Sequence, residues 1–187
     1  MWYYIKWTIW LLLIAMIGTF LHYTLPRNDV VRITDTYEKR VDFGDNSIFW
    51  ANSNTGESTE VTGRDVFFIQ AFRPNGNPII YRNEDTGWGW PPYFKFNTSN
   101  LQAHATDLQS SEDAPRWVAV KKYGWRMQYL SIYPNAISVK LVDGPDTRVI
   151  PWISISILVV LGCIWLAIWS RWRKFRAKRI DPLLDGE

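Results

Sequence analysis

Residues 151–179 read Pro151-Trp-Ile-Ser-Ile-Ser-Ile-Leu-Val-Val-Leu-Gly-Cys-Ile-Trp-Leu-Ala-Ile-Trp169 followed directly by Ser170-Arg-Trp-Arg-Lys-Phe-Arg-Ala-Lys-Arg179. The first part carries no charged side chain, whereas the second carries six Lys and Arg within nine residues. A long uncharged run is typical of a transmembrane helix, and a basic cluster at one end of such a helix stays in the cytoplasm. We therefore predict a membrane protein with a cytoplasmic C-terminal tail.

A second apolar run lies near the N-terminus, from Trp7 to Leu25, and ends at Pro26 and Arg27. Its nineteen residues form a helix of roughly 28 Å, close to the ~30 Å thickness of the hydrocarbon core. It is too long for the apolar core of a cleaved signal peptide, and no small-x-small cleavage site follows it. We therefore predict an uncleaved anchor, which places the N-terminus in the cytoplasm as well.

These two spans divide the 187-residue chain into five predicted parts. They are a cytoplasmic N-terminus (1–6), a transmembrane helix (7–25), a periplasmic mainly-β domain (26–150), a second transmembrane helix (151–170) and a basic cytoplasmic tail (171–187). We expect the bacterial inner membrane as the location. Whether the two spans pack closely on each other is left open, because neither contains a Gly-x-x-x-Gly seam.

Tryptophan usage supports this division, because seven of the twelve Trp residues lie in or beside the apolar runs. Trp favours the headgroup level of a bilayer, and Lys and Arg beside it extend toward anionic lipid. We predict these lipid contacts: Trp7, Trp10, Trp152, Trp169, Arg171, Trp172, Arg173, Lys174, Arg176, Lys178 and Arg179.

The net charge of +3 is a local feature of the tail. Residues 171–187 carry six basic and three acidic groups, whereas residues 26–150 carry fourteen basic and fifteen acidic groups. A nearly neutral outer domain does not favour nucleic-acid binding. The single cysteine, Cys163, lies in the second span, so a disulfide within the chain is excluded.

The outer domain begins with a strand pattern at Val30 to Tyr37 and a second short apolar run at Ser47 to Ala51. Residues 52–60 are polar and predict a loop. Val66 to Phe72 predicts a buried strand, and Pro78 to Arg82 its return strand. Asn75 and Gly76 between them favour a tight hairpin turn.

A helix is predicted over residues 99–109, with Ser99 as its N-cap, because the apolar spacing changes to four and three residues. Strands follow at Trp117 to Val120, Met127 to Tyr133 and Ala136 to Val142, and Gly124 ends the first of them. Five or more strands with one helix before the last ones is an order similar to a small OB-like barrel. A different α+β sandwich would give the same pattern.

Candidate reactive residues are few. The two histidines, His22 and His104, lie far apart in the chain and are interpreted as an interfacial anchor and a solvent-facing residue. Glu84 and Asp85 are adjacent acids, as are Glu112 and Asp113, and we interpret both pairs as solubilising turn residues. The sequence contains no Gly-x-Ser-x-Gly motif and no phosphate-cradling glycine loop. We expect no catalytic residue, cofactor or metal.

The segment Trp88-Gly-Trp-Pro-Pro-Tyr-Phe94 predicts a rigid aromatic loop, because two prolines exclude regular structure. Trp88, Trp90 and Tyr93 are the predicted partner-binding residues, since aromatic side chains on a fixed backbone lose little entropy on contact. The loop is expected either to recognise a partner or the membrane surface, or to fold over one end of the barrel as part of its core.

Several stretches of the chain carry a resemblance to a known family. They are Leu21-His-Tyr-Thr-Leu-Pro26, Phe94-Lys-Phe96, Asn100-Leu-Gln-Ala103, Trp117-Val-Ala-Val120, Tyr123-Gly-Trp-Arg126 and Leu130-Ser-Ile-Tyr-Pro-Asn-Ala136. They resemble an uncharacterised bacterial family of short two-span inner-membrane proteins. The resemblance implies a bacterial inner-membrane location and no established activity.

The sequence therefore predicts a non-enzymatic accessory or structural subunit of a larger inner-membrane complex, whose partners are the lipid bilayer and other integral membrane proteins. The alternative is a membrane-anchored periplasmic module that binds a ligand or an envelope polymer. An enzyme would need a converging pair of carboxylates, which the sequence does not indicate.

Overall fold

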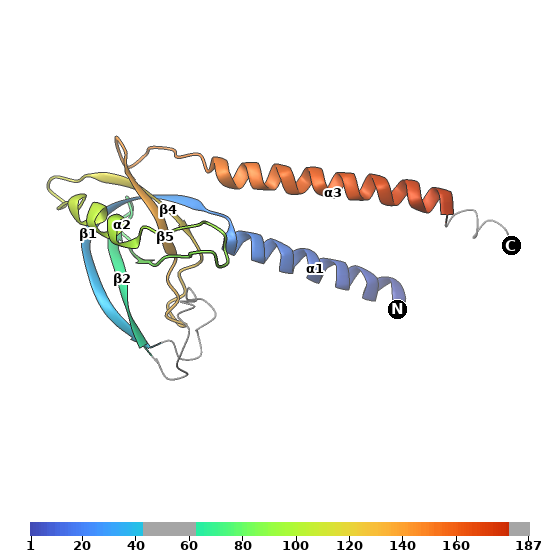
Figure 1. Cartoon of the computed structure of the whole chain (residues 1–187), viewed down its shortest axis with the longest axis horizontal. Helices are drawn as coiled ribbons and strands as arrows, with labels where there is room; N and C mark the ends of the chain where they lie inside the picture. The colour runs from blue at the N-terminus through green and yellow to red at the C-terminus, as the bar shows by residue number, and fades with distance from the viewer. Residues whose placement is uncertain (43–62, 180–187) are drawn as a thin grey trace. The chain divides into compact units, whose positions relative to one another are not determined.

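The computed structural model describes residues 1–42 and 63–179, and the chain divides into two compact units after Ile150. The first unit contains α1 (Trp2–Thr24), β1 (Arg27–Asp42), β2 (Gly63–Phe72), β3 (Pro78–Asn83), α2 (Thr98–Asp107), β4 (Trp117–Tyr123) and β5 (Asn135–Leu141). The second unit contains α3 (Trp152–Arg179). Figure 1 shows the strands and α2 gathered into one β-rich body, from which α1 extends.

The strands close into a barrel in the order β1-β2-β3-β5-β4. Over the described residues, β3 and β5 form the parallel contact, through Arg82 and Asn135, and the other neighbouring strands are antiparallel. β1 is long enough to pair with β4 along its first half and with β2 along its second half. A bulge between Ile33 and Asp35 bends it between these two partners.

The core lies inside the barrel and follows the period-two alternation of its strands. Its residues are Val31, Ile33, Ile69, Ala71, Ile79, Tyr81, Leu101, Ala105, Leu108, Val118, Val120, Ala136 and Val139. Three of them belong to α2 or directly follow it, so this helix packs against the barrel interior. Each buried aliphatic side chain contributes about 1.5–3 kcal/mol on burial.

The outer face of β2 carries a second apolar cluster, formed by Val66 and Phe68. The Phe68 ring stacks on Tyr37 of β1 at 5.4 Å between centroids and meets Tyr133 edge-on at 5.2 Å. The guanidinium of Arg126 lies 4.2 Å from the centre of the Tyr133 ring. This aromatic row joins β1, β2 and the connection between β4 and β5 on one face.

Most of the predicted strands are confirmed. The patterns at 30–37, 66–72, 78–82, 117–120 and 136–142 correspond to β1, β2, β3, β4 and β5. The hairpin turn at Asn75 and Gly76 is also confirmed, because the Arg73 amide donates to the Asn77 carbonyl at 3.0 Å and Gly76 has a φ of 77°. The predictions for residues 47–51 and 52–60 lie outside the described residues.

The predicted strand at Met127 to Tyr133 is wrong. Met127 and Ile132 form an isolated bridge around a tight turn, in which the Ser131 amide donates to the Gln128 carbonyl at 3.1 Å. Ser131 has a φ of 50°, outside the extended region. The alternating apolar residues of this segment therefore belong to a loop that folds back on itself and not to a continuous strand.

The predicted N-cap Ser99 is wrong as well. α2 begins at Thr98, and the N-cap residue Asn97 makes no side-chain cap bond. Instead, the Asp85 carboxylate accepts the Thr98 amide at 3.0 Å and the Thr98 hydroxyl at 2.8 Å. An acid thirteen residues away therefore satisfies the first turn and also complements the positive end of the helix dipole.

Asp85→Ala is expected to lower the free energy of unfolding of the barrel by about 1 kcal/mol, the usual loss when a helix cap is removed. Asp113→Ala, at an exposed acid after α2, is the matched control and should change it little. Urea unfolding of the full chain in mild detergent, followed by far-UV circular dichroism, measures both. Equal stabilities of the two variants would contradict the assigned cap.

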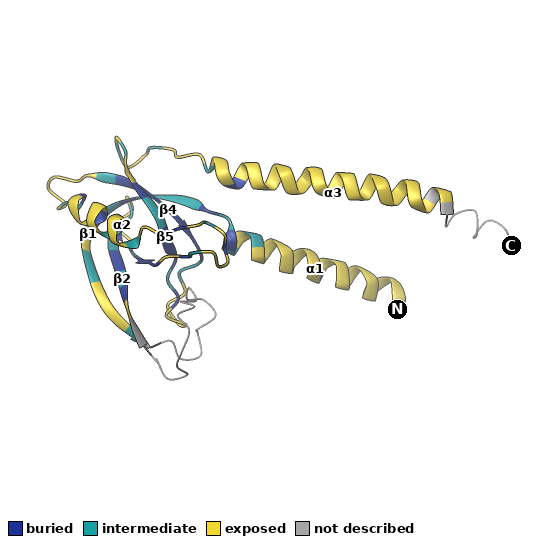
Figure 2. Cartoon of the chain, viewed as in Figure 1, coloured by how far each residue is buried: buried dark blue, intermediate teal, exposed yellow. Residues whose placement is uncertain are grey.

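The two terminal helices are almost entirely exposed. Both α1 and α3 are long and apolar enough to cross a membrane. Figure 2 shows them exposed over nearly their whole length, in contrast to the strands, which contain many of the buried residues. α1 begins at Trp2, before the predicted start at Trp7, and α3 continues through the basic run to Arg179.

Candidate functional surface where α1 meets the barrel

The end of α1 is built into the barrel without a flexible linker. Thr24 is buried, and β1 begins at Arg27, three residues later. The Gly124 amide after β4 donates to the Tyr23 carbonyl at 2.9 Å, and the Tyr93 hydroxyl donates to the Thr24 carbonyl. Groups of the barrel therefore satisfy carbonyls that a helix end leaves without partners.

Residues 88–96, here named the aromatic loop, are closed at their base by hydrogen bonds that backbone amides donate. The Gly87 amide donates to the Lys95 carbonyl at 3.1 Å, and the Lys95 amide donates to the Thr86 hydroxyl at 3.2 Å. The Gly89 amide donates to the Thr86 carbonyl at 2.9 Å, and the Trp90–Pro91 peptide bond is cis. The segment contains no helix or strand, so the prediction of an irregular loop is confirmed, whereas its rigidity stays a prediction.

Aromatic contacts arrange the side chains of the aromatic loop. Trp88 meets Phe94 at 5.3 Å and Phe96 at 5.8 Å, both edge-on. Trp90 stacks on Phe20 of α1 at 5.6 Å with an interplanar angle of 14°. The loop therefore runs beside the last turns of α1, where Figure 1 shows a green segment next to the end of that helix.

The three predicted partner-binding residues have different surroundings. Trp88 and Trp90 are 83% and 65% exposed, so they do not plug the barrel. Tyr93 is half-buried, and its ring lies 5.1 Å from that of Tyr123. Partner binding remains a prediction for Trp88 and Trp90, whereas Tyr93 positions the loop against the end of α1.

A buried ion pair lies behind the aromatic loop. Arg82 Nη1 of β3 lies 3.0 Å from Glu84 Oε2, and the two side chains are 4% and 5% exposed. Hydroxyls of Tyr123 and Tyr23 are hydrogen-bonded to Arg82. Burial lowers the pKa of the Arg82 guanidinium, and those two hydroxyls oppose the shift. Because Tyr23 belongs to α1, this ion pair connects the helix with the barrel.

Asn135 holds the backbone beside this ion pair. Its side-chain oxygen accepts the Glu84 amide at 3.0 Å, and its side-chain nitrogen donates to the Glu84 carbonyl at 3.0 Å and to the Tyr123 hydroxyl at 3.1 Å. Asn135 is fully buried at the start of β5. It therefore ties β3, β4 and β5 together where the parallel pairing is short.

Lys95 is a second buried cation in the same region, 3% exposed. Its Nζ donates to the side-chain oxygen of Asn83, to the Glu84 carbonyl at 3.0 Å and to the Thr98 hydroxyl at 3.3 Å. Burial lowers the pKa of Lys95 to about 7, and the Asp85 carboxylate opposes this shift. Arg82, Glu84, Lys95 and Asn135 are named the polar cluster below.

The sequence interpretation missed the polar cluster. Glu84 was expected in solvent, but it is buried in the ion pair, so that expectation is wrong; Asp85, Glu112 and Asp113 are exposed as expected. The sequence gives little indication of this burial, because nothing in the adjacent pair Glu84 and Asp85 distinguishes a buried acid from an exposed one. The position of Arg82 is a usable signal. A charged residue that directly continues an apolar strand indicates a buried cation, which needs an acid as its partner.

His22 lies on the exposed side of the same junction. Its Nδ1 lies 2.8 Å from the indole nitrogen of Trp125, and its Nε2 lies 3.0 Å from Arg27 Nη1. A neutral imidazole accepts at one nitrogen only, so these two donors compete for it. The interpretation of His22 as a polar anchor agrees with these contacts, and His104 is exposed on α2 as expected.

A separate ionic group is centred on Asp29 of β1. The Asp29 carboxylate accepts the Tyr81 hydroxyl at 2.9 Å and pairs with Lys122 Nζ at 2.9 Å, and Arg73 lies 3.9 Å away. Burial raises the pKa of Tyr81 well above its ordinary value, and the Asp29 charge adds to that shift. These groups satisfy one another and stabilise the barrel interior.

The predicted lipid-contact residues lie on the exposed terminal helices. Trp7 and Trp10 are exposed on α1, and Trp152, Trp169 and Trp172 on α3. The side chains of Arg171, Arg173, Lys174, Arg176 and Lys178 are exposed as well, whereas that of Arg179 is not described. Arg173 lies 5.0 Å from the Trp169 ring centre, so aromatic and basic side chains alternate on α3.

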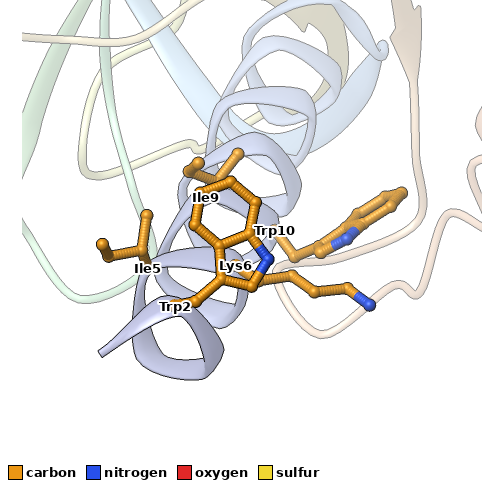
Figure 3. Close-up of a pocket in the computed structure, with 5 residues that line it drawn as sticks. All are labelled: Trp2, Ile5, Lys6, Ile9 and Trp10. Atoms are coloured by element: carbon orange, nitrogen blue, oxygen red, sulfur yellow. The ribbon is translucent and has the colours of Figure 1, made fainter.

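The notch shown in Figure 3 belongs to α1 alone. It is lined by Trp2, Ile5, Lys6, Ile9 and Trp10. These side chains lie along one face of a single helix, at spacings of three and four residues. The notch is therefore a gap between neighbouring side chains on an exposed helix and does not form an enclosed site.

These features define a class of small protein in which a closed five-stranded barrel is joined directly to a long apolar helix. A family model described as "Protein of unknown function (DUF1523)" matches residues 3–176, so the chain belongs to that family. The chain is 38% identical over 148 residues to an "Uncharacterized protein" of Haemophilus influenzae, a match covering 79% of this chain and 80% of the relative. No solved structure matches the chain. The predicted resemblance to an uncharacterised bacterial family is confirmed.

Proposed function

We propose that α1 and α3 cross the bacterial inner membrane, with both chain ends in the cytoplasm and the barrel in the periplasm. Both helices are long, apolar and exposed, as lipid-facing helices are. Six basic residues at the end of α3 favour a cytoplasmic C-terminus by the positive-inside rule. Two spans then place the barrel on the outer side.

The barrel is OB-like in this proposal. Its order β1-β2-β3-β5-β4 and the position of α2 between β3 and β4 support that classification. In such barrels the outer face of β2 and β3, together with the β1–β2 and β4–β5 connections, carries ligands. The classification therefore indicates which face of the barrel would bind a ligand.

The chain acts as a non-enzymatic accessory subunit that docks on a larger inner-membrane complex. The observation that carries this proposal is the linker-free junction, in which Tyr93 and Gly124 hold the last turn of α1. A barrel fixed in this way stays at one height above the bilayer, which suits a docking subunit. The exposed helices offer the surface through which other membrane proteins associate.

Blue-native electrophoresis of membranes solubilised in mild detergent tests this proposal. We expect the chain, expressed from its own promoter, to migrate in a band much heavier than its dimer, and chemical crosslinking to identify the proteins in that band. Overexpressed chain is the control, because excess subunit should appear in a free pool. Migration only as a monomer or homodimer at native levels would refute the accessory role.

A periplasmic binding module is the second candidate. Tyr37 and Tyr133 favour it, because these two half-buried rings cover Phe68 on the face that carries ligands in OB-like barrels. Aromatic rings on such a face are suited to stacking against the flat faces of polymer units. A chain that migrates only as a monomer or homodimer in the experiment above would favour this candidate.

A further inference from the structure

The aromatic loop exposes four large rings within nine residues. Trp88, Trp90, Phe94 and Phe96 are 83%, 65%, 54% and 57% exposed. Among residues 86–97, only Lys95 is charged, and its side chain is buried in the polar cluster. The outward surface of the loop is therefore aromatic and uncharged, which is costly to leave in water.

The position of Trp90 relative to α1 gives the depth of this surface. Its ring stacks on Phe20, which lies four residues before the end of α1 at Thr24. Four residues at about 1.5 Å each place Phe20 about 6 Å below the start of the barrel. The tip of the aromatic loop therefore extends back along the helix, toward its apolar middle.

The loop is held in this position from its base. The Lys95 backbone is tied to Thr86 and Gly87, its ammonium is anchored in the polar cluster, and Tyr93 is bonded to Thr24. The exposed rings consequently lose little conformational entropy when they are covered. They also lie on a surface continuous with the exposed apolar side chains of α1, such as Phe20.

We propose that the aromatic loop is a membrane wedge, which inserts Trp88, Trp90, Phe94 and Phe96 into the interfacial region of the outer leaflet. This inference rests on the proposed function, since it requires that α1 spans the bilayer. The occupant is lipid because the medium that surrounds Phe20 also surrounds the ring stacked on it. Trp rings suit this depth, since they combine an apolar body with one N–H group.

The wedge has a mechanical consequence. Because the barrel is joined to α1 without a linker, it rotates together with that helix about the helix axis, and a second membrane contact beside the helix fixes this rotation. The aromatic loop and α1 are joined through Trp90 and Tyr93, so they enter the bilayer as one rigid unit. The face of the barrel that carries the aromatic loop then always faces the membrane.

Site-directed spin labelling of the full chain, reconstituted in phosphatidylethanolamine–phosphatidylglycerol vesicles, tests the wedge. Cys163→Ser gives a cysteine-free background, because Cys163 is the only cysteine of the chain. Labels are introduced by Trp88→Cys, Trp90→Cys, Leu11→Cys and Tyr129→Cys, and collisions with oxygen and with a water-soluble nickel chelate are measured. Leu11 reports on α1, and Tyr129 is the control, since it is a fully exposed aromatic residue in the connection between β4 and β5.

We expect labels at 88, 90 and 11 to collide several-fold more often with oxygen than with the nickel chelate, relative to the label at 129. If the label at 11 favours oxygen but those at 88 and 90 favour the chelate, the wedge is wrong and the span stands. If the label at 11 favours the chelate, the proposed span itself fails, and the wedge with it. Labels at 88 and 90 shielded from both reagents would mean that protein covers the loop, which also overturns the wedge.

Discussion

Glu84→Gln is expected to lower the free energy of unfolding of the barrel by about 3–5 kcal/mol, the usual result of removing one partner of a buried ion pair. Arg82 lies 3.0 Å from Glu84 and is 4% exposed, so its charge would lose its counter-ion while remaining out of water. The amide of Gln is nearly isosteric with the carboxylate. Shape is therefore kept while charge is removed.

Hydrogen–deuterium exchange of the full chain in detergent micelles measures this loss. The slowest amides of β4, which pairs with β1 on one edge and β5 on the other, report the free energy of the cooperative opening of the barrel. Glu112→Gln makes the same chemical change at an exposed acid and should leave those amides unchanged. Unchanged exchange in Glu84→Gln would show that the ion pair does not hold the barrel together.

A double variant separates charge pairing from packing. Arg82→Met combined with Glu84→Met removes both charges and leaves apolar side chains of similar length, so we expect a smaller loss than from Arg82→Met alone. The two single changes would then be strongly non-additive. Additive losses would mean that Arg82 acts chiefly through its hydrogen bonds to Tyr23 and Tyr123.

Most strands of the barrel were predictable because they carry local signals. Val66 to Phe72 is apolar and short, Asn75 and Gly76 specify a turn, and Gly124 ends a strand with a φ of 88°. Each of these features depends on neighbours within a few residues. The order of the elements along the chain, with one helix before the last strands, followed from them, whereas the closure of the sheet into a barrel did not.

The polar cluster was not predictable, because its contacts join residues far apart in the chain. Asn135 and Glu84 are separated by fifty-one positions, and they meet only when β3 and β5 pair in parallel. The same reason explains the cap of α2, which comes from Asp85 and not from the nearby Ser99. Local preference correctly predicted a helix, but tertiary contact decided where it begins.

The aromatic loop was recognisable from Trp88-Gly-Trp-Pro-Pro, but its direction was not. Both outcomes, a core plug or an exposed surface, were compatible with the composition. The deciding contacts are the Phe20–Trp90 stack and the inward Lys95, which turn the rings outward beside α1. Alternation places Lys95 opposite Phe94 and Phe96, but the usual preference for buried apolar and exposed charged residues predicts the reverse of the observed direction.

The stability of the barrel is expected to rise with pH above neutrality through Lys95. Burial lowers the pKa of Lys95 to about 7 from an ordinary value of 10.5. Between these values the unfolded chain binds a proton that the folded chain has released, so the free energy of unfolding increases with pH. From about pH 7 to about pH 9 this group contributes up to about 2–3 kcal/mol, and below pH 7 the cost of the buried ammonium is fully present.

Urea unfolding of the full chain in detergent, followed by far-UV circular dichroism at several pH values, measures this slope. Lys95→Met should flatten it, whereas Lys140→Met, at an exposed lysine of β5, should keep it. Parallel curves for wild type and Lys95→Met would contradict the lowered pKa. They would mean instead that the oxygens around Nζ, from Asn83, Glu84 and Thr98, keep the ammonium charged, since three acceptors match its three N–H donors.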